Sequence, residues 1–134
     1  MQRAPQRDKN EESCLVTVFK FLFPHFKIVS ITTLYFLLCV GLYVYPLFMD
    51  LSDQKDYNCM LYLLGAKYLP NIQNGEIWRL VFPMVLHGGI DHIGMNMIVL
   101  AMLGFACEHY LTWVKYIVLI VVGAVGGNIF SAVF

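Results

Sequence analysis

The sequence predicts an all-α membrane protein, a polytopic helix bundle, and two observations support this fold class. Hydrophobic residues make up 59% of the 134 residues and charged residues 13%, whereas a soluble domain carries roughly 25% charged residues. The apolar residues also gather in three runs of about 20 residues, the length that a helix needs to cross the hydrocarbon core of a bilayer. The formal net charge is zero, so no basic surface points to nucleic acid as a partner.

Residues 1–27 are predicted to form a cytoplasmic polar tail followed by a short segment at the membrane surface. Residues 1–13 are polar and charged, a composition typical of disordered tails. Residues 15–26 are mostly apolar, and Pro24 interrupts them. We expect this second segment to lie along the membrane surface as a short amphipathic helix.

Residues 28–134 are predicted to form the membrane domain, in which the three apolar runs are the spanning helices. The first run has no charged residue over about 22 positions, and tyrosines near its end suit an interface. The long connection after it is predicted to be a luminal or extracellular loop with a short helix of its own. The spans are placed at about 28–49, 83–106 and 114–134, the loop at 50–82, and the helix of the loop within 57–67.

Basic residues near the spans predict the orientation, because cytoplasmic segments carry an excess of Lys and Arg. Five precede the first span and three lie in the loop. We therefore place the N-terminus in the cytoplasm and expect an integral, multi-pass membrane protein whose organelle the sequence does not identify. The basic residues are Arg3, Arg7, Lys9, Lys20 and Lys27 before the span, and Lys55, Lys67 and Arg79 in the loop.

His92 and Asn96 are the leading functional-site candidates, because they are polar residues inside the second predicted span. They lie four residues apart, so their side chains face the same side of a helix. Neutral imidazole and carboxamide groups donate hydrogen bonds without carrying full charge, and such donors in a water-poor site stabilise an oxyanion. The residues alone leave a second interpretation open, in which the pair hydrogen-bonds to a neighbouring helix and is structural.

A metal site over His87, Asp91 and His92 is a less favoured interpretation of the same segment. His87 and Asp91 have the four-residue spacing that converges on a helix, but His87 and His92 are five apart. Gly88 and Gly89 also argue against a regular helix there. The four cysteines of the chain form no CxxC pair. We therefore expect neither a metal nor a cofactor.

Five further residues are predicted to be structural. Trp78 and Arg79 precede the second span, where Trp suits the interface and Arg binds carbonyl or phosphate oxygens. Glu108 lies at the inner end of that span, and we expect it to hydrogen-bond to a neighbouring helix or loop. Gly123 and Gly127 recur four residues apart in the third span, a small-residue pattern that permits close helix packing.

With these residues in place, the chain resembles the rhomboid family of intramembrane serine proteases, most of all the eukaryotic secretase-like type. The resemblance covers about residues 57–134 and implies a six- or seven-helix bundle, of which three spanning helices lie here. It also implies an active site in a water-filled cavity that is open to the outside. The residues that carry it are Gly75-Glu-Ile-Trp78-Arg79-Leu, Pro83-Met-Val-Leu-His87, His92-Ile-Gly-Met-Asn96 and Glu108.

The resemblance implies that His92 and Asn96 help to hold the oxyanion during peptide hydrolysis. In the family, a Ser in a GxSG motif on a later span is the nucleophile, and a His on a further span activates it. None of the serines in this chain lies in GxSG, and the remaining His after Asn96 is His109, at the predicted inner face of the membrane. We therefore expect the chain to be the N-terminal portion of a rhomboid that is inactive alone.

The predicted function is that of a rhomboid-like intramembrane serine endopeptidase. This chain is predicted to be a fragment of it that lacks the nucleophile and the base. Its partners are then the lipid bilayer and single-pass membrane proteins as substrates. The alternative is a non-catalytic pseudoprotease of the same family that binds membrane clients. A GxSG motif and a later membrane His in the full-length protein distinguish the first function from the second.

Overall fold

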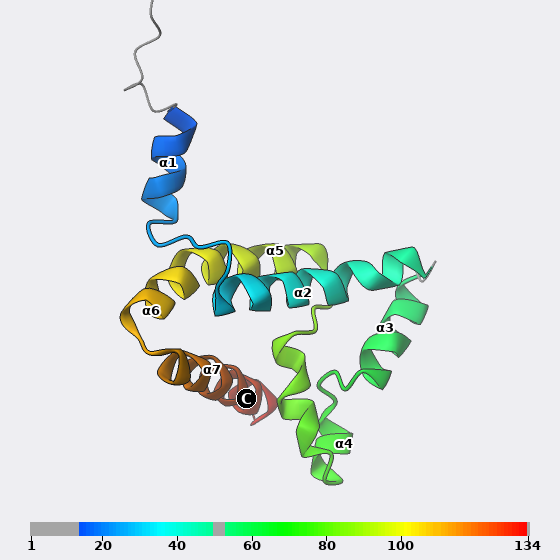
Figure 1. The fold of residues 1–134 in the computed structure, drawn as a ribbon. Helices are drawn as coiled ribbons and strands as arrows, with labels where there is room; N and C mark the ends of the chain where they lie inside the picture. Colours follow the sequence, from blue (N-terminus) through cyan, green and yellow to red (C-terminus); the bar gives the residue numbers. More distant parts are fainter. Residues whose placement is uncertain (1–13, 50–52, 134) are drawn as a thin grey trace, which may run out of the picture.

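The computed structural model describes residues 14–49 and 53–133, and the regular elements of this part are helices, with no strand among them (Figure 1). The predicted all-α fold class is therefore confirmed. The predicted tail over residues 1–13 lies outside the described residues. The elements are α1 (Cys14–Leu22), α2 (Ile31–Phe48), α3 (Gln54–Leu63), α4 (Leu69–Gln73), η1 (Ile77–Leu80), η2 (Phe82–Met84), α5 (Ile90–Val99), η3 (Leu100–Gly104), α6 (Phe105–Tyr110) and α7 (Trp113–Val133).

Two helices in the described part are long and apolar enough to cross a membrane. One is the continuous helix Ile90–Tyr110, which joins α5, the π-helical turn η3 and α6, and the other is α7. Each has 21 residues, or roughly 31 Å at a rise of 1.5 Å per residue, which matches the thickness of a hydrocarbon core. The first predicted span corresponds to α2, a shorter apolar helix.

The second spanning helix begins at Ile90, later than the predicted start at Pro83. The residues before it form the 3₁₀ turn η2 and an irregular turn. Gly89 precedes the helix with an extended backbone and provides no side-chain cap. Because glycine costs about 1 kcal/mol in a helix relative to alanine, the tandem Gly88-Gly89 favours a helix that starts after it.

The predicted loop helix also differs in its bounds, since α3 covers Gln54–Leu63 rather than a segment within 57–67. Asp53 starts α3, because its carboxylate accepts a hydrogen bond from the backbone N–H of Lys55 at 3.1 Å. Gly65 follows the end of α3 with φ of 95°, a left-handed conformation that favours glycine. The end of the helix near Gly65 was predictable from the glycine. The helix starts before the predicted residue 57 because Asp53 caps it.

The buried core lies between α2 and α5, which run side by side (Figure 1). Cys39 of α2 packs there against Ile93 and Met97 of α5. By contrast, α7 has one buried residue, Tyr116, and its other apolar side chains are largely exposed. Exposed apolar side chains around a 21-residue helix suit contact with lipid.

Four residues form a junction where α2, α6 and α7 meet, which we call the Glu108 junction: Thr32, Gly104, Glu108 and Tyr116. Glu108 accepts hydrogen bonds from the backbone N–H groups of Ile31 and Thr32, both at 2.9 Å. The Thr32 hydroxyl also donates to Glu108 at 2.6 Å, so the Tyr116 hydroxyl, 2.8 Å away, donates to Thr32 Oγ1. A carboxylate at the start of α2 is also favoured by the helix dipole.

Gly104 is expected to be intolerant of any side chain, because the Glu108 junction leaves no space for one. A Cβ atom there would lie 2.8 Å from Cγ2 of Thr32 and 2.9 Å from the hydroxyl of Tyr116. Gly104→Ala should lower the free energy of unfolding by roughly 1–3 kcal/mol, measured by chemical unfolding in detergent micelles. The control is Gly94→Ala in α5, where a Cβ meets no atom within 4 Å. Equal stabilities of the two variants would contradict the close packing.

Candidate active site

His92 and Asn96 lie in the first two turns of α5 and line one cavity of ≈ 530 Å³. Asn96 is six residues past the first residue of α5, which places it roughly 9 Å along the helix axis. The structure thus brings the predicted pair together on one side of the second spanning helix, beside a cavity. The cavity is also lined by Tyr35, Leu61, Ala66, Lys67, Pro83, Met84, Leu86, His87, Gly88, Ala124, Asn128 and Ser131.

Neither His92 nor Asn96 hydrogen-bonds through its side chain to another residue in the described part of the chain. The His92 ring instead contacts the His87 ring, with centroids 5.4 Å apart and an interplanar angle of 66°. Asn96 also lines a neighbouring cavity of ≈ 280 Å³. Both side chains therefore keep their donor capacity for a group bound in the cavity, and no described helix supplies the partner that the structural interpretation requires.

His87 is a cavity residue to which the sequence analysis gave no catalytic or structural role. Its side chain is 4% exposed and its Nδ1 atom has no hydrogen-bond partner. Burial lowers the pKa of His87 below its ordinary value, which keeps the imidazole neutral. His87 and His92 form no metal centre with a third residue, because no three His, Cys, Asp or Glu side chains converge in the described segments.

Two tyrosines fix the turn that carries His87. The Tyr57 hydroxyl of α3 donates to the carbonyl of His87 at 2.5 Å. The Tyr35 hydroxyl of α2 donates to the carbonyl of Met84, also at 2.5 Å. These contacts satisfy backbone carbonyls of η2 and of the irregular turn after it, and they hold this segment beside the start of α5. His87 and His92 are five residues apart, a spacing that does not converge on a regular helix. The two rings nevertheless meet, because His87 lies in this turn and not in α5.

Lys67 and Ser131 also line the cavity of His92 and Asn96 and contact each other. Lys67 Nζ donates to the hydroxyl of Ser131 and, at 3.1 Å, to its backbone carbonyl. The Lys67 amine is the donor in both contacts. Among the described residues, no His, Asp or Glu side chain contacts the Ser131 hydroxyl.

Arg79 joins the end of α3 to the segment before the second spanning helix. Its buried guanidinium donates to the carbonyls of Tyr62 at 2.9 Å and Ala66 at 3.0 Å, and lies 4.4 Å from the centroid of the Tyr62 ring. It also pairs with Glu76 at 2.5 Å, and this hydrogen bond lowers the pKa of the Glu76 carboxyl. Arg79 therefore fixes the loop that covers one side of the cavity.

The other three residues with predicted structural roles have fewer contacts in the described part. Trp78 is half-exposed next to Arg79. At Gly123 and Gly127 of α7 a Cβ atom would meet nothing within 4 Å, so this face packs against no described helix. Close packing at the two glycines stays a prediction. A contact that the sequence did not predict attaches α7 instead, since Asn128 Nδ2 donates to the carbonyl of Leu80 at 2.9 Å.

Replacing Arg79 by lysine is expected to destabilise the loop despite the conserved charge. A lysine ammonium cannot reproduce the fork of the guanidinium toward Tyr62, Ala66 and Glu76, so part-buried carbonyls lose a donor. Arg79→Lys should lower the free energy of unfolding by about 1–3 kcal/mol and speed limited proteolysis between α3 and α4. The control is Lys55→Arg, the opposite exchange at an exposed position. Equal proteolysis rates for the two variants would contradict the role of Arg79 in fixing the loop.

Comparison with known proteins shows which proteins the chain is similar to. Residues 74–134 match the model of the Rhomboid domain. The chain is 29% identical over 119 residues to Rhomboid-like protease 1 of Toxoplasma gondii, covering 87% of this chain and 40% of that protein. It is 27% identical over 105 residues to Rhomboid protease AarA of Providencia stuartii, covering 78% and 37%. With RHOMBOID-like protein 9, chloroplastic, of Arabidopsis thaliana it shares 39% over 70 residues, covering 52% and 16%.

The chain spans less than half the length of these three relatives. No solved structure matches it. The segment that matches the domain model contains both cavity donors, His92 and Asn96, together with Arg79 and Glu108. Together with the two apolar helices of spanning length, these matches support an integral membrane protein whose residues 74–134 are similar to the Rhomboid domain.

Proposed function

We propose that this chain is part of an intramembrane serine endopeptidase in which His92 and Asn96 hold the oxyanion. The observation that carries the proposal is a pair of donors, one helical turn apart and without partners among the described residues, beside a cavity of ≈ 530 Å³. Relatives named as rhomboid proteases support a proteolytic reaction over other uses of such a cavity.

The two donors act on the charge that develops when a serine attacks a peptide carbonyl. The carbonyl oxygen becomes an oxyanion, and the side-chain amide of Asn96 and a ring N–H of His92 donate to it. A donor placed at this oxygen contributes typically about 2.7–4 kcal/mol of transition-state stabilisation. His87 packs against the His92 ring and positions it. Because burial lowers the pKa of His87, its ring adds no charge of its own next to His92.

The nucleophile and the base come, in this proposal, from a part of the protein outside these 134 residues. The family resemblance assigns them to a GxSG serine and a later membrane histidine, and the chain contains no GxSG motif. We assign no nucleophilic role to Ser131, because it lies in no GxSG motif and no described His or carboxylate side chain contacts its hydroxyl. We therefore propose that the 134-residue polypeptide alone does not hydrolyse peptides.

The substrates follow from where the cavity lies along the spanning helix. It adjoins the start of α5, whereas Lys20, Lys27 and the Glu108 junction lie toward the other end of the helices. With the N-terminus in the cytoplasm, the cavity opens toward the luminal or extracellular side. We propose single-pass membrane proteins as substrates, cut close to that side of the bilayer.

A fluorophosphonate probe, which reacts with activated serines, tests the proposed function on the full-length protein. We expect labelling of a GxSG serine in the full-length protein, weaker labelling of its Asn96→Ala variant, and no labelling of the 134-residue polypeptide. A folded full-length protein that stays unlabelled would favour the pseudoprotease alternative. Labelling at Ser131 would contradict the assignment of the nucleophile to another segment.

A further inference from the structure

The orientation of the His92 ring follows from its contact with His87. The His92 side chain is exposed toward the cavity and makes no hydrogen bond to a described residue. Its ring meets the His87 ring, with centroids 5.4 Å apart. A donor stabilises an oxyanion when it is directed at that oxygen before the reaction starts. The position of His87 therefore matters for the proposed role of His92.

The His87 ring is in turn fixed to its own segment of backbone. The side chain is 4% exposed, and Nδ1 has no hydrogen-bond partner among the described residues. The ring hydrogen-bonds to the backbone of Val85, two residues earlier in the same turn. Because this polar contact lies within the turn, the backbone of residues 84–87 sets the position of the ring.

Two tyrosine hydroxyls from different helices hold this backbone, one at each end. The hydroxyl of Tyr35 in α2 donates to the carbonyl of Met84 at 2.5 Å. The hydroxyl of Tyr57 in α3 donates to the carbonyl of His87 at 2.5 Å. Tyr35 and Met84 also line both the cavity of ≈ 530 Å³ and the neighbouring cavity of ≈ 280 Å³. The first of the two contacts is therefore made by residues of the cavity wall itself.

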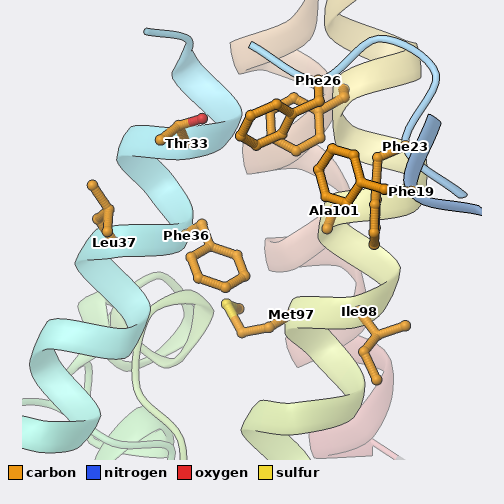
Figure 2. Close-up of a pocket in the computed structure, with 10 residues that line it drawn as sticks. Phe19, Phe23, Phe26, Thr33, Phe36, Leu37, Met97, Ile98 and Ala101 are labelled. Atoms are coloured by element: carbon orange, nitrogen blue, oxygen red, sulfur yellow. The ribbon is translucent and has the colours of Figure 1, made fainter. Parts of the chain in front are cut away.

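Helix α2 supports both tyrosines. Tyr35 packs against the buried core between α2 and α5. In that core the neighbouring Phe36 points toward Met97 of α5 (Figure 2). The Tyr57 ring contacts the ring of Tyr43 in α2, with centroids 6.2 Å apart and an interplanar angle of 75°. Because packed rings hold their hydroxyls in place, α2 determines where the turn lies.

We propose that Tyr35 and Tyr57 are positioning residues of the oxyanion site, which hold the turn of His87 and thereby the ring of His92. The inference rests on the proposed function, in which His92 donates to the oxyanion. It assigns α2 and α3 a part in the reaction, although neither tyrosine acts on the oxyanion directly. Asn96 lies one turn further along α5, where the helix itself sets its position.

Tyr35→Phe and Tyr57→Phe in the full-length protein test the role, because each change removes a hydroxyl and keeps the ring. Each should lower kcat about tenfold and change KM little, since a misplaced donor weakens the transition state most. This loss is smaller than the roughly 10²–10³-fold loss expected when a donor is removed. The control is Tyr45→Phe, at a half-exposed tyrosine of α2. An equal loss of kcat in the control would overturn the role.

Combination with His92→Ala separates positioning from a general loss of stability. If the tyrosines act through His92, Tyr35→Phe and Tyr57→Phe should cost nothing further in kcat once residue 92 is alanine. In an Asn96→Ala background the tenfold loss should persist. A loss of kcat that adds in full to that of His92→Ala would overturn the positioning role.

An NMR measurement distinguishes a failure of this inference from a failure of the proposed function. In full-length protein labelled with ring-¹³C histidine, the His92 signal is the one that His92→Ala removes. Tyr57→Phe should shift or broaden it and leave the signal of His109, in α6, unchanged. An unchanged His92 signal would overturn the positioning role. A changed signal together with full activity of His92→Ala would support the positioning contacts and contradict the oxyanion role of His92 instead.

Discussion

Asn96→Ala in the full-length protein is expected to lower kcat by about 10²–10³-fold, the usual effect of removing one oxyanion donor. KM should change little, because the amide is needed when the carbonyl oxygen becomes charged and contributes less to substrate binding. The midpoint of unfolding should stay close to that of the wild type, since Asn96 bonds to no described residue. Cleavage of a membrane-embedded substrate in vesicles measures kcat and KM, and chemical unfolding measures stability.

A matched change of the same residue type controls for the loss of an amide. Asn58 is exposed on α3 and accepts a hydrogen bond from Gln54, outside the cavity. Asn58→Ala should therefore leave kcat within a few-fold of the wild-type value. If Asn96→Ala lost stability and activity in parallel, the structural interpretation of the pair would gain over the oxyanion role. His92→Ala should reproduce the loss of kcat if the imidazole is the second donor.

Glu108→Ala is expected to cause the largest loss of stability, about 2–4 kcal/mol. The change leaves the first two N–H groups of α2 and the hydroxyl of Thr32 without their acceptor. It also removes a negative charge from the N-terminal end of the helix dipole. Chemical unfolding in detergent micelles measures the effect, and it should be present in the 134-residue polypeptide as well as in the full-length protein.

Glu108→Gln separates the hydrogen bonds of Glu108 from its charge. The carboxamide keeps one acceptor oxygen but replaces the other with a donor, which faces donors of α2. We expect a stability between those of wild type and Glu108→Ala. The neighbouring His109→Ala is the control, because its ring stacks on His25 and takes no part in the Glu108 junction. A loss in Glu108→Ala no greater than in His109→Ala would contradict the capping role.

The parts of the site that follow from helical periodicity were predictable from sequence. His92 and Asn96 share one face of α5 because four residues make about one turn, and no long-range contact is needed to place them together. The stop at Gly65 likewise follows from the preference of glycine for a left-handed backbone. Sequence rules therefore predict a feature correctly when the interactions that determine it lie within about one helical turn.

The parts that depend on distant partners could not be predicted in the same way. The donors to Glu108 lie 76 and 77 positions earlier in the chain, and no spacing rule connects them. The position of His87 depends on Tyr57, which is 30 residues away, and on a turn that Tyr35 also holds from a distant helix. The carbonyls that Arg79 binds belong to Tyr62 at the end of α3 and to Ala66 just after it, on the two sides of the turn at Gly65.

The most direct test of the oxyanion role is a structure of the full-length protein with a peptidyl phosphonate bonded to its catalytic serine. The phosphonate oxygen takes the place of the oxyanion, so its neighbours identify the groups that stabilise it. We expect that oxygen at about 2.7–3.1 Å from the side-chain nitrogen of Asn96, with a ring nitrogen of His92 also directed at it. A phosphonate oxygen directed away from both residues, with their side chains bonded to another helix, would contradict the role.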